Sequence, residues 1–210
     1  MEWSPETTFE LCVLRSSWIN PTVVADSSSA FHIVYSDDTP ASLYYLQYAD
    51  GVLSSPEPVM TGDFLSTQAV ASIDGSDRIY VTFEDDRTGS RRGWLMMRDP
   101  VSGIWSDGVD MVGLNHSNNR YQNVPLPDGR LAVVWTDRRD GTRGLYSKIF
   151  DPAISEAEIQ ALPDDEIDAL YSEQKNQTRL CVDAHGTLHL VWSDQREHPH
   201  WQLYYSTCTP

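Results

Sequence analysis

The sequence predicts an all-β domain made of four copies of one sheet unit, and three observations carry the prediction. A short apolar strand ending in an aromatic residue occurs four times, and an aspartate follows each aromatic residue two positions later. The aromatic residues are 48, 52 and 57 positions apart. They are Tyr35, Phe83, Trp135 and Trp192, followed by Asp37, Asp85, Asp137 and Asp194. Several short strands in a period of about 50 residues are typical of a β-propeller blade.

The third copy shows the unit most clearly, in the sequence DGRLAVVWTDRRDGTRGLYSKIF at 128–150. Asp128 and Gly129 form a tight-turn signal, and an apolar strand, a polar loop and a second apolar strand follow. This pattern predicts a β-hairpin. The same hairpin is predicted at 30–48, 78–97 and 187–205.

Each hairpin is preceded by a further strand, which begins near Asn20, Gln68, Arg120 or Gln177. In the usual propeller order this strand is the innermost and lines the central axis. Segments at 54–60 and 105–111 follow a complete hairpin and are predicted as outermost strands. Because both faces of a blade pack against neighbouring blades, the hairpin strands are expected to be apolar at nearly every position, as they are.

The N-terminal segment 1–15 resembles an outermost strand that has no hairpin before it, whereas the last hairpin has no strand after it. We therefore expect Trp3 to Leu14 to pair with Trp201 to Thr207, so that the N-terminal strand completes the last blade. The prediction is one domain over 1–210, a β-propeller with four four-stranded blades. The blades span about 16–60, 61–112, 113–162, and 163–210 plus 1–15. Two alternatives are half of an eight-bladed ring formed by a dimer, and a fragment of a larger protein.

The segment 152–175 interrupts the repeat. We expect an outer strand at 154–162, followed by a short helix or ordered loop from Pro163, where Ile167, Leu170 and Tyr171 have near-helical spacing. A loop longer than its counterparts is often functional, although an acidic, solvated insertion without a function is the alternative.

The chain is strongly acidic, with 15 Lys and Arg against 31 Asp and Glu and a net charge of −16. This charge argues against nucleic acid and anionic membrane as partners, since both attract basic proteins. The first residues do not form a signal peptide, and the chain is compatible with the mature part of a secreted or cell-surface protein. No cofactor is expected, although a cation could bind in the central channel.

Propeller topology gathers the hairpin loops and the entrances to the inner strands on one rim. There we expect aromatic rings to stack on a ligand while polar side chains hydrogen-bond it. The candidate ligand-binding residues are Trp18, Asn20, Arg87, Arg120, Tyr121, Arg139, Arg196, His198, His200 and Trp201.

Three of these candidates, Arg87, Arg139 and Arg196, occupy the same repeat position. Converging guanidinium groups could hold a carboxylate. Alternatively, each arginine pairs with the loop aspartate two residues before it or with the next blade, and those aspartates serve as turn formers. His198 and His200 have a spacing that can ligate metal, but no third ligand accompanies them, and no metal site is predicted.

The hairpins VWTDRRDGTRGLYS and VWSDQREHPHWQLYYS, with the Trp-Ser-Pro and Trp-Ser-Asp openings, resemble the repeats of sialidase-like (BNR-type) bacterial propellers. The resemblance covers nearly the whole chain and implies the propeller fold. The Asp-box of that family, Ser-x-Asp-x-Gly-x-Thr-Trp, does not occur here, and its Tyr/Glu nucleophile pair has no match.

These observations favour a non-enzymatic, lectin-like binding module for a carbohydrate or protein ligand. The alternative is a sialidase-like glycoside hydrolase, or a fragment of one. It requires a pair of carboxylates about 5–9.5 Å apart at the rim, for which Asp38, Asp86 and Glu197 are the candidates. A third hypothesis is an assembly role. The chain would be a monomer or a homodimer.

Overall fold

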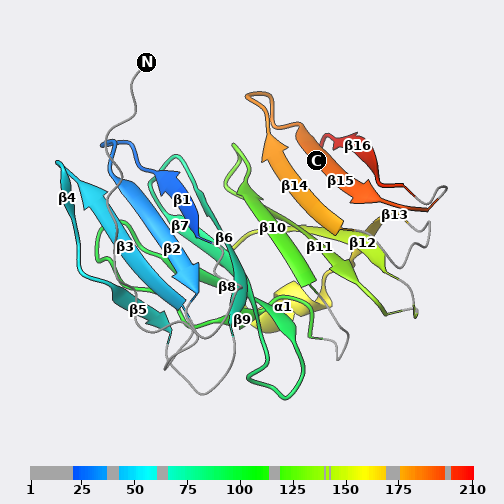
Figure 1. Ribbon diagram of the computed structural model, residues 1–210, viewed down its shortest axis with the longest axis horizontal. Coiled ribbons are helices and arrows are strands. Elements are labelled where there is room, and N and C mark those ends of the chain that lie inside the picture. The colour runs from blue at the N-terminus through cyan, green and yellow to red at the C-terminus, as the bar shows by residue number, and fades with distance from the viewer. Residues whose placement is uncertain are drawn as a thin grey trace.

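A computed structural model of the protein describes residues 21–36, 43–60, 66–113, 119–139, 141, 143–168, 176–196 and 200–210. Within these residues the chain forms four antiparallel sheets and one short helix (Figure 1). The fold is a β-propeller with one sheet per blade, as predicted. Each sheet is a meander in which the strands pair in sequence order from the inner strand outward, except that the last two strands of the first sheet both pair with its third strand.

The sheets are labelled A to D in chain order. Sheet A contains β1 (Thr22–Ala25), β2 (Phe31–Ser36), β3 (Leu43–Ala49), β4 (Val52–Leu53) and β5 (Glu57–Met60). Sheet B contains β6 (Thr67–Ile73), β7 (Ile79–Asp85), β8 (Arg92–Arg98) and β9 (Val109–Asp110). Sheet C contains β10 (Asn119–Pro125), β11 (Leu131–Asp137), β12 (Gly144–Phe150) and β13 (Asp165–Asp168). Sheet D contains β14 (Asn176–Val182), β15 (Leu188–Asp194) and β16 (Gln202–Cys208).

The first strands of the sheets, β1, β6, β10 and β14, are the innermost strands of the blades. Strand β6 contacts β1 and β10, and β10 contacts β14, so the four line the centre of the molecule in sequence order (Figure 1). The entrances to these strands therefore lie together on one rim, as the sequence predicts.

The apolar hairpin strands form the interfaces between blades. Every residue of β7 and of β11 is buried, because both faces of these strands pack against a neighbouring sheet. Separate apolar clusters fill the interfaces of sheets A with B, B with C, and C with D. At the largest of them, Trp135 stacks between Tyr121 and Tyr146, with ring centroids 6.0 and 6.2 Å away.

The segment after sheet C's hairpin differs from the prediction. The outer strand expected at 154–162 is instead the helix α1 (Glu156–Ala161), and the outer strand of sheet C is β13, within the segment expected to be helical or a loop. Ser155 caps the helix and forms a reciprocal capping box with Glu158. Ile159 anchors the helix in the core. Sheet C therefore extends past the predicted blade boundary at residue 162.

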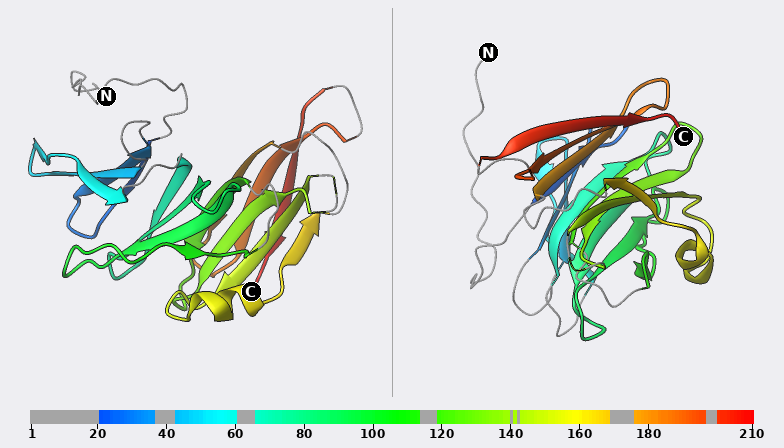
Figure 2. Two further views of the ribbon diagram at one scale, coloured as in Figure 1. Left: turned by 90° about the horizontal axis from the view of Figure 1, so that it is seen from below. Right: turned by 90° about the vertical axis from the view of Figure 1, so that its right-hand side faces the viewer.

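Sheets A and D lie at opposite ends of the row of blades (Figure 2). The predicted pairing of Trp3 to Leu14 with sheet D lies outside the described residues and stays a prediction. Among the described residues, no helix is long and apolar enough to cross a membrane.

Candidate ligand-binding site at the propeller axis

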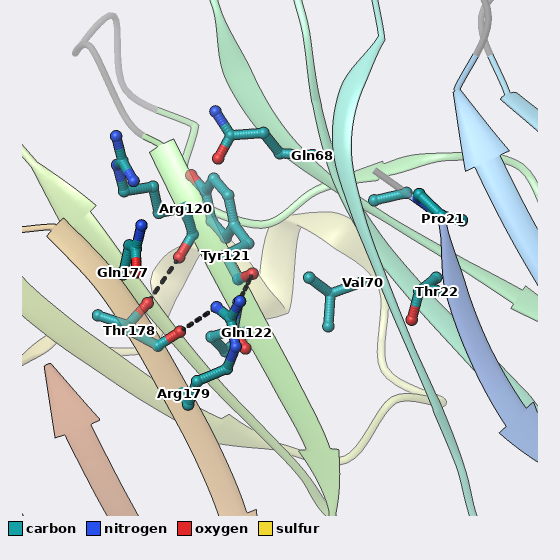
Figure 3. A pocket seen from close by; sticks show the side chains of 11 residues that line it. Pro21, Thr22, Gln68, Val70, Arg120, Tyr121, Gln122, Gln177, Thr178 and Arg179 are labelled. Atoms are coloured by element: carbon teal, nitrogen blue, oxygen red, sulfur yellow. Dashed lines mark hydrogen bonds between the residues drawn. The ribbon is translucent and has the colours of Figure 1, made fainter. Parts of the chain in front are cut away.

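A pocket of about 520 Å³ opens where the inner strands converge on the rim (Figure 3). One short segment of each sheet lines it: 21–22, 68–70, 120–122 and 177–179. These segments contribute amide side chains from Gln68, Gln122 and Gln177 and guanidinium groups from Arg120 and Arg179. The described lining contains no Asp or Glu, although the chain as a whole is acidic. The pocket therefore offers hydrogen-bond donors and acceptors together with positive charge.

Three residues that line this pocket have left-handed backbone conformations. Gln68, Arg120 and Gln177 have φ of 56°, 62° and 51°, respectively. They occupy the same repeat position, and in each sheet a register shift between the first two strands includes the residue. A left-handed non-glycine residue is strained by about 1 kcal/mol or more, and such residues concentrate at functional sites. The fold thus repeats a β-bulge that turns these residues toward the axis.

A buried carboxylate holds the bulge of sheet C. Glu84 of β7 is fully buried, and its Oε1 accepts a hydrogen bond of 2.6 Å from the backbone N–H of Arg120. This contact joins sheet B to the left-handed residue of sheet C. A charge-assisted hydrogen bond of this kind can stabilise a strained backbone conformation.

Burial is the dominant influence on Glu84 and raises its pKa from 4.5 to about 7. The Arg120 N–H and the positive charges of Arg91, Arg120 and Arg143 oppose this effect without cancelling it. The Arg91 guanidinium lies 3.7 Å from Glu84 Oε2. Burial also lowers the pKa of Arg143, and repulsion from Arg138 and Arg120 adds to the decrease. Several arginines therefore surround one carboxylate beside the pocket.

One hydrogen bond between neighbouring sheets and two bonds within single strands order the pocket wall. The Thr178 hydroxyl donates to the Arg120 carbonyl over 3.2 Å, joining sheet D to sheet C (Figure 3). The side chains of Gln122 and Arg179 donate to the carbonyls of Tyr121 and Thr178 over 2.9 and 2.8 Å. Because these bonds use backbone acceptors, the wall is preorganised.

The predicted site residues fall into separate environments. Arg120 and Tyr121 line the pocket, but the Tyr121 ring is fully buried and stacks on Trp135. An ideal Cβ at Gly93 would lie 1.8 Å from Tyr121 Cζ, so glycine is needed there for the ring to fit. The ring thus supports the pocket from behind and has no exposed surface to stack on a ligand.

Arg87, Arg139 and Arg196 each pair with the aspartate two residues earlier, which is the second of the two interpretations drawn from the sequence. The shortest contacts of Arg139 and Arg196 with Asp137 and Asp194 are 2.7 and 2.6 Å. All three aspartates, including Asp85, are fully buried. Each guanidinium also lies over an aromatic ring of the next strand, at 4.0, 3.9 and 4.1 Å from the centroids of Trp94, Tyr146 and Tyr204. This repeated unit anchors the hairpin loops.

His200 and Trp201 are exposed at the start of β16 and are not among the pocket-lining residues. Trp18, Asn20 and His198 lie outside the described residues, as do Asp38 and Glu197. Asp86 is described and exposed. The described residues bring together no group of three or more His, Cys, Asp and Glu side chains that could hold a metal ion.

Sequence reasoning missed Glu84, although a signal exists. The residue between the strand-ending aromatic and the aspartate is Ser36, Thr136 or Ser193 in the other repeats. A carboxylate at this position is exceptional, and it belongs to the interface beside Arg120.

Comparisons with solved structures agree with the propeller fold. An α-L-arabinanase from Penicillium chrysogenum, solved with arabinobiose, superposes with a TM-score of 0.68 at 10% identity, covering 92% of this chain and 63% of that one. An ulvan lyase gives 0.63 at 10% identity, with 90% and 52% covered. An α-L-arabinofuranosidase from Fusarium graminearum gives 0.60 at 9% identity, with 88% and 64% covered.

The chain thus spans about half to two thirds of the length of these proteins. At such low identity the likeness shows the fold alone. No protein-family model matches the sequence, and no curated protein matches it. These structural neighbours are carbohydrate-active propellers, and the sialidase-like character expected from the sequence is not specifically supported.

Proposed function

We propose that the protein binds a carbohydrate in the pocket at the propeller axis. The observation that carries the proposal is the left-handed bulge repeated at Gln68, Arg120 and Gln177, which turns polar residues toward one cavity. An amide side chain both donates and accepts hydrogen bonds, as a sugar hydroxyl does. The pocket volume of about 520 Å³ is within the usual range for small-molecule sites.

The structural neighbours support this ligand class. The arabinanase was solved in complex with arabinobiose, and the ulvan lyase was solved bound to a -[GlcA(1-4)Rha3S]- saccharide. The first is a neutral sugar and the second carries acidic groups, so a binding screen needs both kinds. Arg120 and Arg179 can hydrogen-bond either kind, because guanidinium groups donate to hydroxyl as well as to anionic oxygens.

The test is calorimetric titration with neutral arabino-oligosaccharides and with acidic oligosaccharides, using the protein and its Gln177→Gly and Gln68→Gly variants. Glycine suits the left-handed backbone, so these variants remove the amide groups without straining the fold. Each should weaken binding about tenfold, the effect of losing one or two hydrogen bonds. Gln47→Ala on β3, outside the pocket, is the control and should bind normally. If both glycine variants bound with the wild-type affinity, the proposed binding site would be wrong.

Glycoside cleavage is the second candidate, and the enzymatic activities named for the neighbours favour it. Glu84 has a pKa of about 7, as a general acid requires, but its carboxyl group is fully buried behind Arg120. Among the described residues, the pocket lining provides no carboxylate pair. Incubation with arabinan and ulvan, followed by detection of new reducing ends, tests cleavage directly. Release of oligosaccharides would make the protein an enzyme, and binding without release would make it a binding module.

A further inference from the structure

Sheet D exposes a face that has the composition of an interface between blades. We call it the sheet D outer face, and it consists of Cys181, His189, Val191, Leu203 and Tyr205. The opposite face of the sheet packs against sheet C through Leu180, Leu190, Trp192 and Tyr204. Because side chains alternate along a strand, the residues of the outer face point away from sheet C.

The same positions are buried in sheet A. Val34, Leu43 and Tyr45 of sheet A pack into the cluster shared with sheet B and are 0%, 0% and 3% exposed. The strand registers match them with Val191, Leu203 and Tyr205 of sheet D, since Val34 pairs with Tyr45 and Val191 pairs with Tyr205. In sheet D these residues are 36%, 79% and 62% exposed. One repeat position is thus a core position in one blade and a surface position in another.

A polar network confirms that the two faces are equivalent. In sheet A, His32 contacts Tyr45 Oη through Nδ1 at 2.6 Å and Asp26 through Nε2 at 3.1 Å. In sheet D, His189 makes the matching contacts with Tyr205 and Asp183 at 2.8 and 3.4 Å. The side chains of His32 and Asp26 are 6% and 14% exposed, whereas those of His189 and Asp183 are 31% and 37% exposed. Sheet D therefore has the side chains of a packed blade without a neighbouring sheet on this face in the described chain.

The surface that fits such a face can be identified from the A–B interface. There, Ile79, Val81 and Phe83 of sheet B pack against sheet A. The matching positions in sheet A are Phe31, Ile33 and Tyr35, which lie on the face of sheet A that points away from sheet B. Phe31 and Tyr48 pack together on that face, and with Val23 they are exposed at 44%, 41% and 59%.

We propose that the sheet D outer face binds sheet A of a second copy of this chain. Within one molecule the two sheets lie at opposite ends of the row of blades, so each copy offers one face of each kind (Figure 2). A dimer in which both copies pair sheet D with the partner's sheet A closes the ring through two identical contacts. The apolar side chains buried in these contacts would supply the stabilisation, as they do between neighbouring blades.

The test uses light-scattering mass measurement during gel filtration at about 100 µM protein, well above a micromolar dissociation constant. We expect twice the chain mass of 23.7 kDa. Leu203→Lys on sheet D and Phe31→Lys on sheet A should each give half that mass, with an unchanged circular dichroism spectrum. Val101→Lys is the control, because Val101 is an exposed apolar residue in a turn outside both faces, and it should stay dimeric.

Mixing the two lysine variants tests the orientation of the contact. The Leu203→Lys copy keeps an intact sheet A face, and the Phe31→Lys copy keeps an intact sheet D face. The mixture should therefore recover the dimer mass through one intact contact, although neither variant dimerises alone. A wild-type protein that has the mass of one chain would overturn the proposal. So would a Phe31→Lys variant that remains dimeric, because the sheet D faces would then bind each other.

Discussion

The Glu84 carboxylate accepts a 2.6 Å hydrogen bond from the backbone N–H of Arg120, and this bond joins the core of sheet B to the wall of the axial pocket. The donor residue is left-handed and lines the cavity, whereas the acceptor is fully buried. The protonation state of a buried residue is therefore coupled to the shape of the proposed binding site.

Glu84 should make the protein less stable as the pH rises through neutrality. Its pKa is about 7 in the folded chain and 4.5 when unperturbed, so between these values the folded state binds more protons than the unfolded state. The unfolding free energy contributed by this group is then highest below pH 4.5 and falls as pH rises through 7, by about 3 kcal/mol in total. Glu84→Gln keeps an acceptor oxygen but does not ionise. In urea titrations at pH 5 and pH 8, the unfolding free energy of this variant relative to wild type should therefore increase with pH.

Glu57→Gln, at an exposed position on β5, is the matched control for removing one negative charge. Its difference from wild type should change little between the two pH values. Parallel stability profiles for wild type and Glu84→Gln would show that Glu84 does not titrate in this range.

Gly93 should tolerate no side chain. A Cβ at this position would overlap the Tyr121 ring, which stacks on Trp135 and cannot move without disturbing the core. Gly93→Ala should lower the unfolding free energy by about 3 kcal/mol, the upper range for overpacking. Gly75→Ala, where a Cβ meets open space, should change it by less than about 0.5 kcal/mol in the same denaturation experiment. Restored stability in Gly93→Ala/Tyr121→Leu would identify the ring as the cause, whereas a fully stable Gly93→Ala would contradict the packing described.

Arg139 should contribute to stability and not to ligand binding. It pairs with the fully buried Asp137 and also contacts Asp164 at 2.7 Å. Arg139→Met leaves the buried carboxylate without this partner, which typically costs about 3 kcal/mol. Arg138 is an exposed neighbour, and Arg138→Met should lower the unfolding free energy far less. Thermal unfolding measures the difference, and oligosaccharide titration of the folded Arg139→Met variant should give the wild-type affinity. A loss of affinity in the folded variant would show that Arg139 contributes to ligand binding.

Asp26 and Asp183 occupy equivalent turns in sheets A and D, so comparing them tests how burial by a neighbouring blade affects stability. Burial acts to raise the pKa of Asp26, but hydrogen bonds from Ser28, Ala30 and His32 together lower it to about 2. The stability from this carboxylate is present above its unperturbed pKa of 3.8 and is lost as pH falls through 2. At pH 7, Asp26→Asn should cost about 1–2 kcal/mol, because an amide replaces an ionised acceptor.

In thermal unfolding of the Leu203→Lys variant, in which the proposed dimer contact is disrupted, Asp183→Asn should lower the stability less than Asp26→Asn does, since the network of Asp183 with His189 is more exposed in a single chain. Equal losses at the two positions would mean that the neighbouring blade adds nothing to the sheet A network.

The blade repeat was predictable because it is a local pattern. The strand-ending aromatic residues Tyr35, Phe83, Trp135 and Trp192 locate the four hairpins in the sequence. Their spacing of about 50 residues predicts the number of blades. The helix α1 was missed because its single buried residue, Ile159, gives little periodicity, and the decisive signal was the capping pair Ser155 and Glu158. Residues from different blades combine to form the pocket, and the contact of Glu84 with Arg120 joins positions 36 residues apart.

The arginine–aspartate pairs of the hairpin loops have a consequence for how such a protein diversifies. Because Asp85, Asp137 and Asp194 each bind an arginine only two positions away, each of these three loops is fixed to the strands of its own blade. The rest of each loop can change in length and in residue identity while the strand ends stay in place. Successive blades can thus acquire different recognition surfaces independently, on a framework that stays constant.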